Sequence, residues 1–128
     1  MTRSLRDEFQ EINTRYAAAL SQRGAPGASA FFAEDVDLLR PGPDNFKGAA
    51  AAQAFWAAAS DLFHNARLTT VDAVALGPEF VREIGTYWAE SRVPGGPTVS
   101  GKYVFIWRKL GGDWKIWTDI WASHAGQT

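Results

Sequence analysis

The sequence predicts an α+β protein, with helices in the first half of the chain and a run of antiparallel strands in the second half. Apolar residues recur at helical spacing before His64, and after His64 the spacing changes to two, with more β-branched and aromatic residues. The 128 residues are 46% hydrophobic and 21% charged, which is the balance of an ordinary globular protein. We therefore expect a single domain over residues 1–128.

The first helix is predicted over residues 4–23. Its apolar positions lie three or four residues apart, so they share one face of the helix: Leu5, Phe9, Ile12, Tyr16 and Leu20. Thr2 or Ser4 can cap the start, and Gly24 ends the helix.

The next segments are shorter. Residues 28–33 are typical of a short second helix, and residues 36–40 of a strand that the Pro41-Gly42-Pro43 sequence stops. The alanine-rich residues 48–63 predict a third helix that lies close against its neighbour.

Four strands complete the chain, at residues 68–76, 80–92, 99–109 and 114–122. The Gly95-Gly96-Pro97 sequence marks one turn. Gly111 and Gly112 supply the positive φ angles of a tight hairpin between the last two strands. Because the helices are separate from this run of strands, they must cover one face of the sheet.

Composition excludes several classes of function. A net charge of −1, without basic runs, does not indicate nucleic acid or an anionic membrane as a partner. The absence of cysteine removes disulfides, thiol catalysis and cysteine-bound metals. His64 and His124 are too isolated to form a metal site, and Asp35, Asp37 and His64 lack convincing ligand spacing, so we predict no metal. The sequence has no P-loop or dinucleotide glycine pattern, and we predict no cofactor. The N-terminal residues are not those of a secretory signal and no stretch is long enough to span a membrane, so a cytoplasmic location is expected.

The segment GKYVFIWRKLGGDWKIWTDIWAS, residues 101–123, carries four of the six tryptophans, and Asp119 stands among them. Asp119 is either a general acid or base tuned by a dry pocket, or a carboxylate that pairs with Lys102, Arg40 or Arg82 or caps a loop. If Asp119 faces a cavity, alternation places Trp117 and Trp121 there too.

The sequence does not decide the register of the last hairpin, because the length of its loop is not known from the residues. A three-residue loop would put Tyr103 and Phe105 beside Asp119, whereas a two- or four-residue loop would put Lys102 and Val104 there.

The order of elements, with Phe32–Val36 before the first strand, Gly48 at the start of the third helix and the ending quoted above, resembles the NTF2-like superfamily. More narrowly, the chain is similar to its SnoaL-like, DUF4440 and ketosteroid-isomerase-like small bacterial members. The resemblance implies a cystatin-like cone in which a curved antiparallel sheet wraps around the helices and leaves a pocket at the wide end. It also implies a homodimer formed through the sheet. The superfamily contains enzymes and binding domains, so the fold does not decide function.

The resemblance transfers few catalytic residues. Tyr16 matches the helix tyrosine of ketosteroid isomerases, but Arg40 occupies the place of their base, and no acid lies near Tyr103 or Val104. The chain is therefore not a standard ketosteroid isomerase. Asp119 matches the acidic residue on the last strand of SnoaL-type polyketide cyclases, without an obvious partner histidine.

Two hypotheses of function follow. The first is a cofactor-independent isomerase, cyclase or dehydratase acting by proton transfer on a small apolar or aromatic carbonyl or hydroxy compound. Asp119 would be the acid or base, and Tyr16, Tyr103 or Arg40 would stabilise an oxyanion. The binding residues would be Trp56, Trp88, Tyr103, Trp117 and Trp121. The alternative is a non-catalytic domain that binds a hydrophobic small molecule or only dimerises. Tyr16 could also be a core residue, and Arg40 could pair with Asp37 or Asp44.

Overall fold

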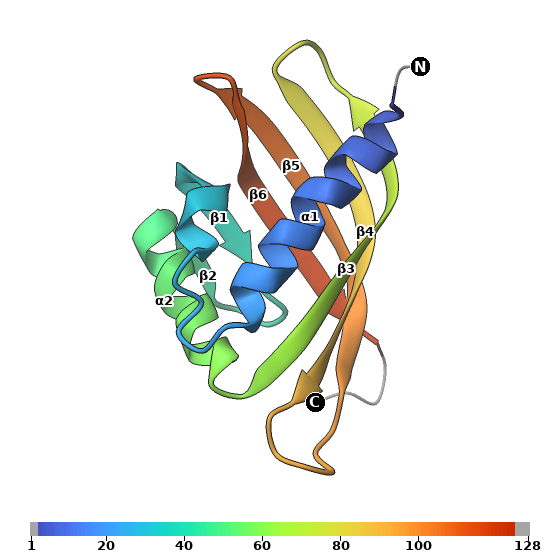
Figure 1. The fold of residues 1–128 in the computed structure, drawn as a ribbon. Helices are drawn as coiled ribbons and strands as arrows, with labels where there is room; N and C mark the ends of the chain where they lie inside the picture. Colours follow the sequence, from blue (N-terminus) through green and yellow to red (C-terminus); the bar gives the residue numbers. More distant parts are fainter. Residues whose placement is uncertain (1–2, 125–128) are drawn as a thin grey trace.

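The structure is a computed structural model that describes residues 3–124 (Figure 1). The helical elements are α1 (Leu5–Ser21), the 3-10 turn η1 (Ala28–Phe31) and α2 (Ala49–Ser60). The strands are β1 (Phe32–Leu39), β2 (Asn45–Lys47), β3 (Phe63–Ala75), β4 (Phe80–Ser91), β5 (Val99–Leu110) and β6 (Asp113–Ser123). They form one sheet in the order β2-β1-β6-β5-β4-β3.

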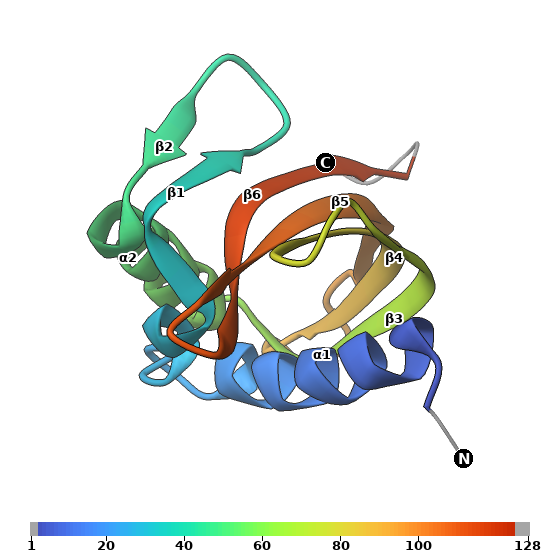
Figure 2. The ribbon, with the colours of Figure 1, turned by 90° about the horizontal axis from the view of Figure 1, so that it is seen from above.

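The sheet is strongly curved and does not close on itself. In Figure 2 its strands bend around α1, which lies across the concave side. The α+β cone predicted from the sequence is confirmed, with one difference in the sheet. Strand β1 pairs with β6 in parallel, while all other neighbours are antiparallel. The chain crosses through α2 from the β1 edge of the sheet to the β3 edge and then returns strand by strand, which brings β6 beside β1.

Helix α1 follows its apolar pattern. The Ser4 hydroxyl accepts a hydrogen bond from the Asp7 backbone N–H over 3.1 Å, which caps the helix as predicted. Its buried face consists of Phe9, Asn13, Tyr16 and Ala17. The polar Asn13 on this face has partners in the sheet, described below.

Two predicted boundaries were wrong, and one strand was not predicted. Only residues 28–31 are helical, because β1 already begins at Phe32 beside β6. Strand β3 begins at Phe63, where we expected the end of a helix, because Phe63 pairs with Ser91 of β4. The short β2 was not predicted and pairs with β1 at the sheet edge. In each case pairing with a distant strand overrides the local pattern.

The core fills one end of the cone. Phe9 of α1 packs against Trp107 and Trp114 with ring centroids 5.2 and 5.3 Å apart, and Ile116 and Val36 are fully buried nearby. No helix within residues 3–124 has the length and apolar character needed to cross a membrane.

The β5–β6 hairpin contains a bulge that sets the inward face of β6. Its loop has two residues, Gly111 and Gly112, with φ of 60° and 87°, and Leu110 pairs with Asp113. Next to the turn Trp107 pairs with Ile116, but beyond it Ile106 pairs with Thr118, so Trp117 is the extra residue.

The bulge reverses the register that the loop length alone would give. Beyond it, Phe105 lies opposite Asp119, and Tyr103 lies opposite Trp121. A two-residue loop therefore produces the neighbours that we expected only from a three-residue loop. The inward side chains of β6 include Trp114, Ile116, Asp119 and Trp121, while Trp117 leaves the alternating pattern.

Candidate functional site

The hollow end of the cone holds a cavity of about 250 Å³. Helix α1, helix α2 and strands β3 to β6 all contribute to its wall. Nine aromatic residues line it: Tyr16, Phe55, Trp56, Phe63, Tyr87, Trp88, Tyr103, Phe105 and Trp121. The polar residues of the lining are few, and include Ser60, His64, Asp119 and Ser123. The lining contains no lysine or arginine, so the cavity is an apolar space with a single acidic side chain.

Asp119 is the acidic side chain of the cavity. It is 2% exposed, and its Oδ1 atom has no hydrogen-bond partner among residues 3–124. Burial raises the pKa of Asp119 well above its ordinary value, and the negative charge of Glu83 raises it further. Among residues 3–124 Asp119 forms no ion pair, and Arg82 pairs instead with Asp72 over 3.2 Å. The carboxyl group therefore favours its neutral form and can exchange a proton with a bound molecule.

Tyr16 brings a second unsatisfied polar group to the same cavity. Its side chain is 1% exposed, and in the described part of the chain its hydroxyl has no hydrogen-bond partner. Burial raises the pKa of Tyr16 well above its usual value, with a smaller contribution from the charge of Asp119. The phenol is neutral and has a free proton to donate.

Trp56 supplies a third unsatisfied polar group. Its indole Nε1–H is buried without a partner, and its ring lies 5.4 Å from that of Trp121. Five buried side-chain atoms of the described chain lack partners, and three of them belong to the cavity lining. Buried polar groups are nearly always hydrogen-bonded, so such a concentration in one cavity is typical of a binding site.

Tyr103 lines the cavity with its ring, but its hydroxyl points elsewhere and donates to the Glu83 carboxylate. Burial, and then the charge of Glu83, raises the pKa of Tyr103. The ring lies across Gly85, where a Cβ atom would be 2.3 Å from the phenol oxygen. Glycine at this position allows the side chain to reach Glu83.

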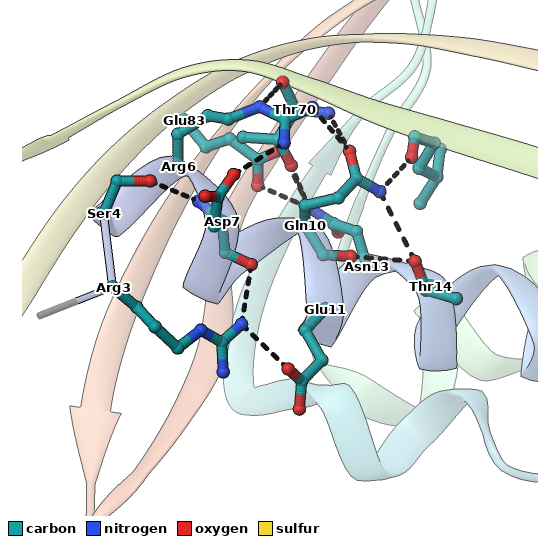
Figure 3. A network of polar contacts seen from close by, with 11 residues as sticks. Arg3, Ser4, Arg6, Asp7, Gln10, Glu11, Asn13, Thr14, Thr70 and Glu83 are labelled. Carbon is teal, nitrogen blue, oxygen red and sulfur yellow. Dashed lines mark hydrogen bonds and ion pairs between the residues drawn. The ribbon is translucent and has the colours of Figure 1, made fainter. Parts of the chain in front are cut away.

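Sequence reasoning missed Glu83, the most extensively hydrogen-bonded side chain near the site. Its side chain is fully buried, and its partners come from α1, β3 and β5. Figure 3 shows Asn13, Thr70 and Glu83 meeting between α1 and the sheet. Alternation along β4 could have found it, because Val81, Glu83 and Gly85 share the buried face, whereas Ile84 is 36% exposed.

The structure brings together six of the predicted site residues in the cavity lining: Tyr16, Trp56, Trp88, Tyr103, Asp119 and Trp121. Trp88 also lies under the Arg67 guanidinium, 5.1 Å from its ring centroid.

Two predicted residues lie elsewhere. Arg40 follows β1 and packs over Phe46 and Phe55, about 6.0 and 5.9 Å from their ring centroids, so its guanidinium does not line the cavity. Asp37, an expected partner of Arg40, pairs with Lys47. Trp117 is turned outward by the bulge, where its Nε1–H donates to Asp35 over 3.3 Å. Within residues 3–124 no group of three or more histidine or acidic side chains could hold a metal ion.

Solved structures of similar fold cover most of the chain. An NTF-2 like protein of unknown function from Shewanella oneidensis has a TM-score of 0.75 and 16% identity, covering 90% of this chain and 96% of its own. A domain of unknown function with a cystatin-like fold from Nostoc punctiforme has a TM-score of 0.74 and 18% identity, covering 96% of this chain and 80% of its own. A ketosteroid isomerase-like protein from Erwinia carotovora has a TM-score of 0.71 and 14% identity, covering 93% and 98%.

At these identities the likeness establishes the fold alone. No curated protein matches the chain. The profile of the SnoaL-like domain matches residues 13–117, which include Tyr16, Trp56 and Tyr103 and end just before Asp119. Because the match spans most of the sequence, the chain belongs to the family of SnoaL-like domains, and its fold is that of the NTF2-like and ketosteroid isomerase-like structures.

Proposed function

We propose that the protein is a cofactor-independent enzyme that transfers a proton on a small apolar or aromatic carbonyl or hydroxy compound bound in the cavity. One observation carries the proposal: within residues 3–124 the Oδ1 atom of buried Asp119 and the buried hydroxyl of Tyr16 have no hydrogen-bond partner, and both side chains line the same aromatic space. A ligand oxygen would satisfy these groups, and proton transfer requires such groups within reach of the reacting atoms.

The arrangement suits an isomerisation. The ionised form of Asp119 would remove a proton from the carbon next to a carbonyl group, and the Tyr16 hydroxyl would donate a hydrogen bond to the oxygen that gains negative charge. The neutral Asp119 would then return the proton to another carbon. A carboxyl group with a raised pKa is a stronger base when ionised, so its burial helps the first step.

The cavity also suggests which ligands fit. A dry cavity of ~150 Å³ holds benzene, so a cavity of about 250 Å³ has room for a larger aromatic or alicyclic compound. Because the lining contains no lysine or arginine, nothing there would balance an anionic ligand. We expect an uncharged compound with its polar end at Asp119 and Tyr16.

Hydrogen–deuterium exchange tests this function without knowledge of the product. The protein is incubated in D₂O with a panel of cyclic and aromatic ketones, and loss of the proton next to the carbonyl group is followed by NMR. We expect exchange with some ketones, and a loss of at least about 100-fold in Asp119→Asn, in line with general acid–base catalysis. Asp37→Asn, at a carboxylate paired with Lys47, is the matched control. Equal exchange rates in wild type and Asp119→Asn would exclude Asp119 as the acid or base.

The second candidate is a domain that binds an uncharged hydrophobic molecule without chemistry. It is favoured by Arg40, which stands at the end of β1 where a ketosteroid isomerase has its base, and lies outside the cavity lining. A ligand that binds and is recovered without exchange would support this function.

We also propose that the protein is a homodimer through the outer face of the sheet. Ile84, Val104 and Ile120 lie opposite one another on β4, β5 and β6. Ile84 is 36% and Ile120 45% exposed, so the row leaves an apolar band on the side away from α1. The cytoplasmic location stays a prediction.

A further inference from the structure

Glu83 is a buried carboxyl group that the proposed reaction does not use. The Asn13 Nδ2 donates to the two Glu83 oxygens over 2.9 and 2.8 Å. The Thr70 hydroxyl and the Trp107 Nε1–H each donate to Glu83 over 2.9 Å, and the Tyr103 hydroxyl also donates to it. Every partner presents a donor, which is the hydrogen-bonding pattern of a carboxylate. Within residues 3–124 no lysine or arginine pairs with Glu83, so neutral groups alone hold it.

The sheet places this carboxylate behind the cavity. Glu83 pairs with Phe105, and Phe105 pairs with Asp119, so the three side chains form one row across β4, β5 and β6. Neighbouring strands are about 4.8 Å apart, so two strand spacings separate Glu83 from Asp119. The buried ring of Phe105 lies between them, and water does not screen the interaction of the two acids.

Tyr103 connects Glu83 to the cavity wall. Its ring faces the cavity and stacks on Phe105 with centroids 4.1 Å apart, while its hydroxyl donates to Glu83 across Gly85. The bond to Glu83 fixes this ring and keeps its hydroxyl away from a ligand. Tyr16 is then the tyrosine with a hydroxyl free to donate inside the cavity.

We propose that Glu83 is a positioning residue of the candidate site, which holds Tyr103 in the cavity wall and, by its negative charge, makes Asp119 a stronger base when it is ionised. The proposal deepens the proposed function of Asp119 and rests on it. Other titratable residues line the same cavity as Asp119: Tyr16 on α1, His64 on β3, Tyr87 on β4 and Tyr103 on β5. The residues of α2 in the lining are not titratable, and on β1 the residue opposite Asp119 is the apolar Leu38.

The test is an NMR titration of the side-chain carboxyl carbons in labelled protein, with Asp119→Asn to assign the Asp119 signal. In Glu83→Gln we expect Asp119 to titrate at a lower pH than in the wild type, because a negative charge has been removed. The matched control is Glu79→Gln, an exposed residue before β4, which should leave the Asp119 midpoint in place. An unchanged midpoint in Glu83→Gln, or an equal change in Glu79→Gln, would overturn the proposal.

A second variant decides the matter if Glu83→Gln does not fold. Tyr103→Phe keeps the ring but removes one donor to Glu83, so the carboxylate charge is less well neutralised. We expect Asp119 to titrate at a higher pH in this variant, and an unchanged midpoint would contradict the proposal. The titrations use ligand-free protein, so they are independent of deuterium exchange. If no ketone exchanges its proton but the Asp119 midpoint changes in Glu83→Gln, the enzyme hypothesis is rejected, while the influence of Glu83 on Asp119 is supported.

Discussion

At the scale of single residues, two buried carboxyl groups share one cross-strand row but differ in their surroundings. Glu83 receives hydrogen bonds from four side chains, whereas Oδ1 of Asp119 receives none. A carboxylate is stabilised where donors surround it, and a neutral acid is favoured where they are absent. The difference separates a carboxyl group that is held by four donors from one that is ready to exchange a proton.

The burial of Asp119 predicts a pH-dependent cost to stability. Because its pKa is raised in the folded state, the folded protein binds more protons than the unfolded chain between an unfolded pKa of about 3.9 and the higher folded value. The contribution of Asp119 to the free energy of unfolding is therefore fully present below about pH 3.9 and is lost as the pH rises through the higher pKa of the folded state.

Asp119→Asn should remove that cost. We expect its Tm to exceed that of the wild type at pH 8 and the difference to shrink as the pH falls to 4. Each unit of pKa is worth about 1.4 kcal/mol, and 1 kcal/mol moves the Tm of a domain of this size by roughly 4 °C. Thermal unfolding by circular dichroism at several pH values provides the measurement. Parallel pH profiles for the two proteins would show that Asp119 does not titrate differently on folding.

Two tyrosines of the cavity should respond in opposite ways to loss of the hydroxyl group. The Tyr16 hydroxyl has no partner, so Tyr16→Phe should leave the free energy of unfolding unchanged or raise it slightly. The Tyr103 hydroxyl donates to buried Glu83, so Tyr103→Phe should lower it by about 1–3 kcal/mol. Urea unfolding of both variants compares them directly. Similar losses in both would mean that Tyr16 has a structural partner.

At the scale of elements, β4 and β5 carry two reciprocal pairs of glycine and tyrosine. Gly85 lies opposite Tyr103, and Tyr87 lies opposite Gly101. At both glycines a Cβ atom would come within 2.6 Å of the tyrosine hydroxyl oxygen. Each tyrosine therefore lies across the glycine of the other strand, a recognised way to stabilise glycine in a sheet. Both rings line the cavity, so these pairs build part of its wall.

Gly85→Ala should displace the Tyr103 ring and break its bond to Glu83. We expect a loss of about 2–4 kcal/mol in the free energy of unfolding, as for overpacking combined with a broken buried hydrogen bond. Gly27→Ala is the control, because its Cβ would meet only Ala19 at 3.5 Å, an ordinary contact. Chemical denaturation gives both values. If the two variants were equally stable, the close approach of Tyr103 to Gly85 would not matter energetically.

The elements also show what the sequence can reveal. The stripe of α1 and the alternation of β5 are local patterns, so the helix and the strand could be predicted from them. The register beside Asp119 could not, because the bulge at Trp117 leaves no composition signal in a strand already rich in tryptophan. Glu83 could have been found by alternation, but its partners on α1 and β3 are 70 and 13 residues away in sequence.

At the scale of the whole molecule, the cone is filled at one end and hollow at the other. Phe9, Trp107 and Ile116 close the end near the β5–β6 turn, and Phe55, Trp56, Ala59 and Ser60 of α2 form part of the cavity wall at the other end. The fold and the presence of aromatic residues at its wide end could be predicted from the sequence. The size of the cavity could not, since it depends on how far α2 stands from the sheet.

The apolar band on the outer face of the sheet predicts a dimer. A single charged side chain introduced into the band should prevent this dimer from forming. Ile120→Glu would place a carboxylate in the apolar band beside Val104, so we expect a monomer with unchanged circular dichroism. Sedimentation velocity measures the mass of wild type and variant at equal concentration. Lys102→Glu, on an exposed side chain of the same face, tests whether any added charge has this effect. A monomeric wild type would exclude this interface.

The aromatic lining has an optical consequence. Trp56 and Trp121 lie 5.4 Å apart with their planes at 36°, close enough for their excited states to couple. Coupled indoles give a pair of circular dichroism bands of opposite sign, whose strength depends on the distance and the angle between the rings. A molecule that enters the cavity and tilts either ring changes that signal, while Trp107, in the filled end of the cone, does not line the cavity. The protein therefore contains its own spectroscopic reporter of occupancy, and a ligand search can begin without a label or a known reaction.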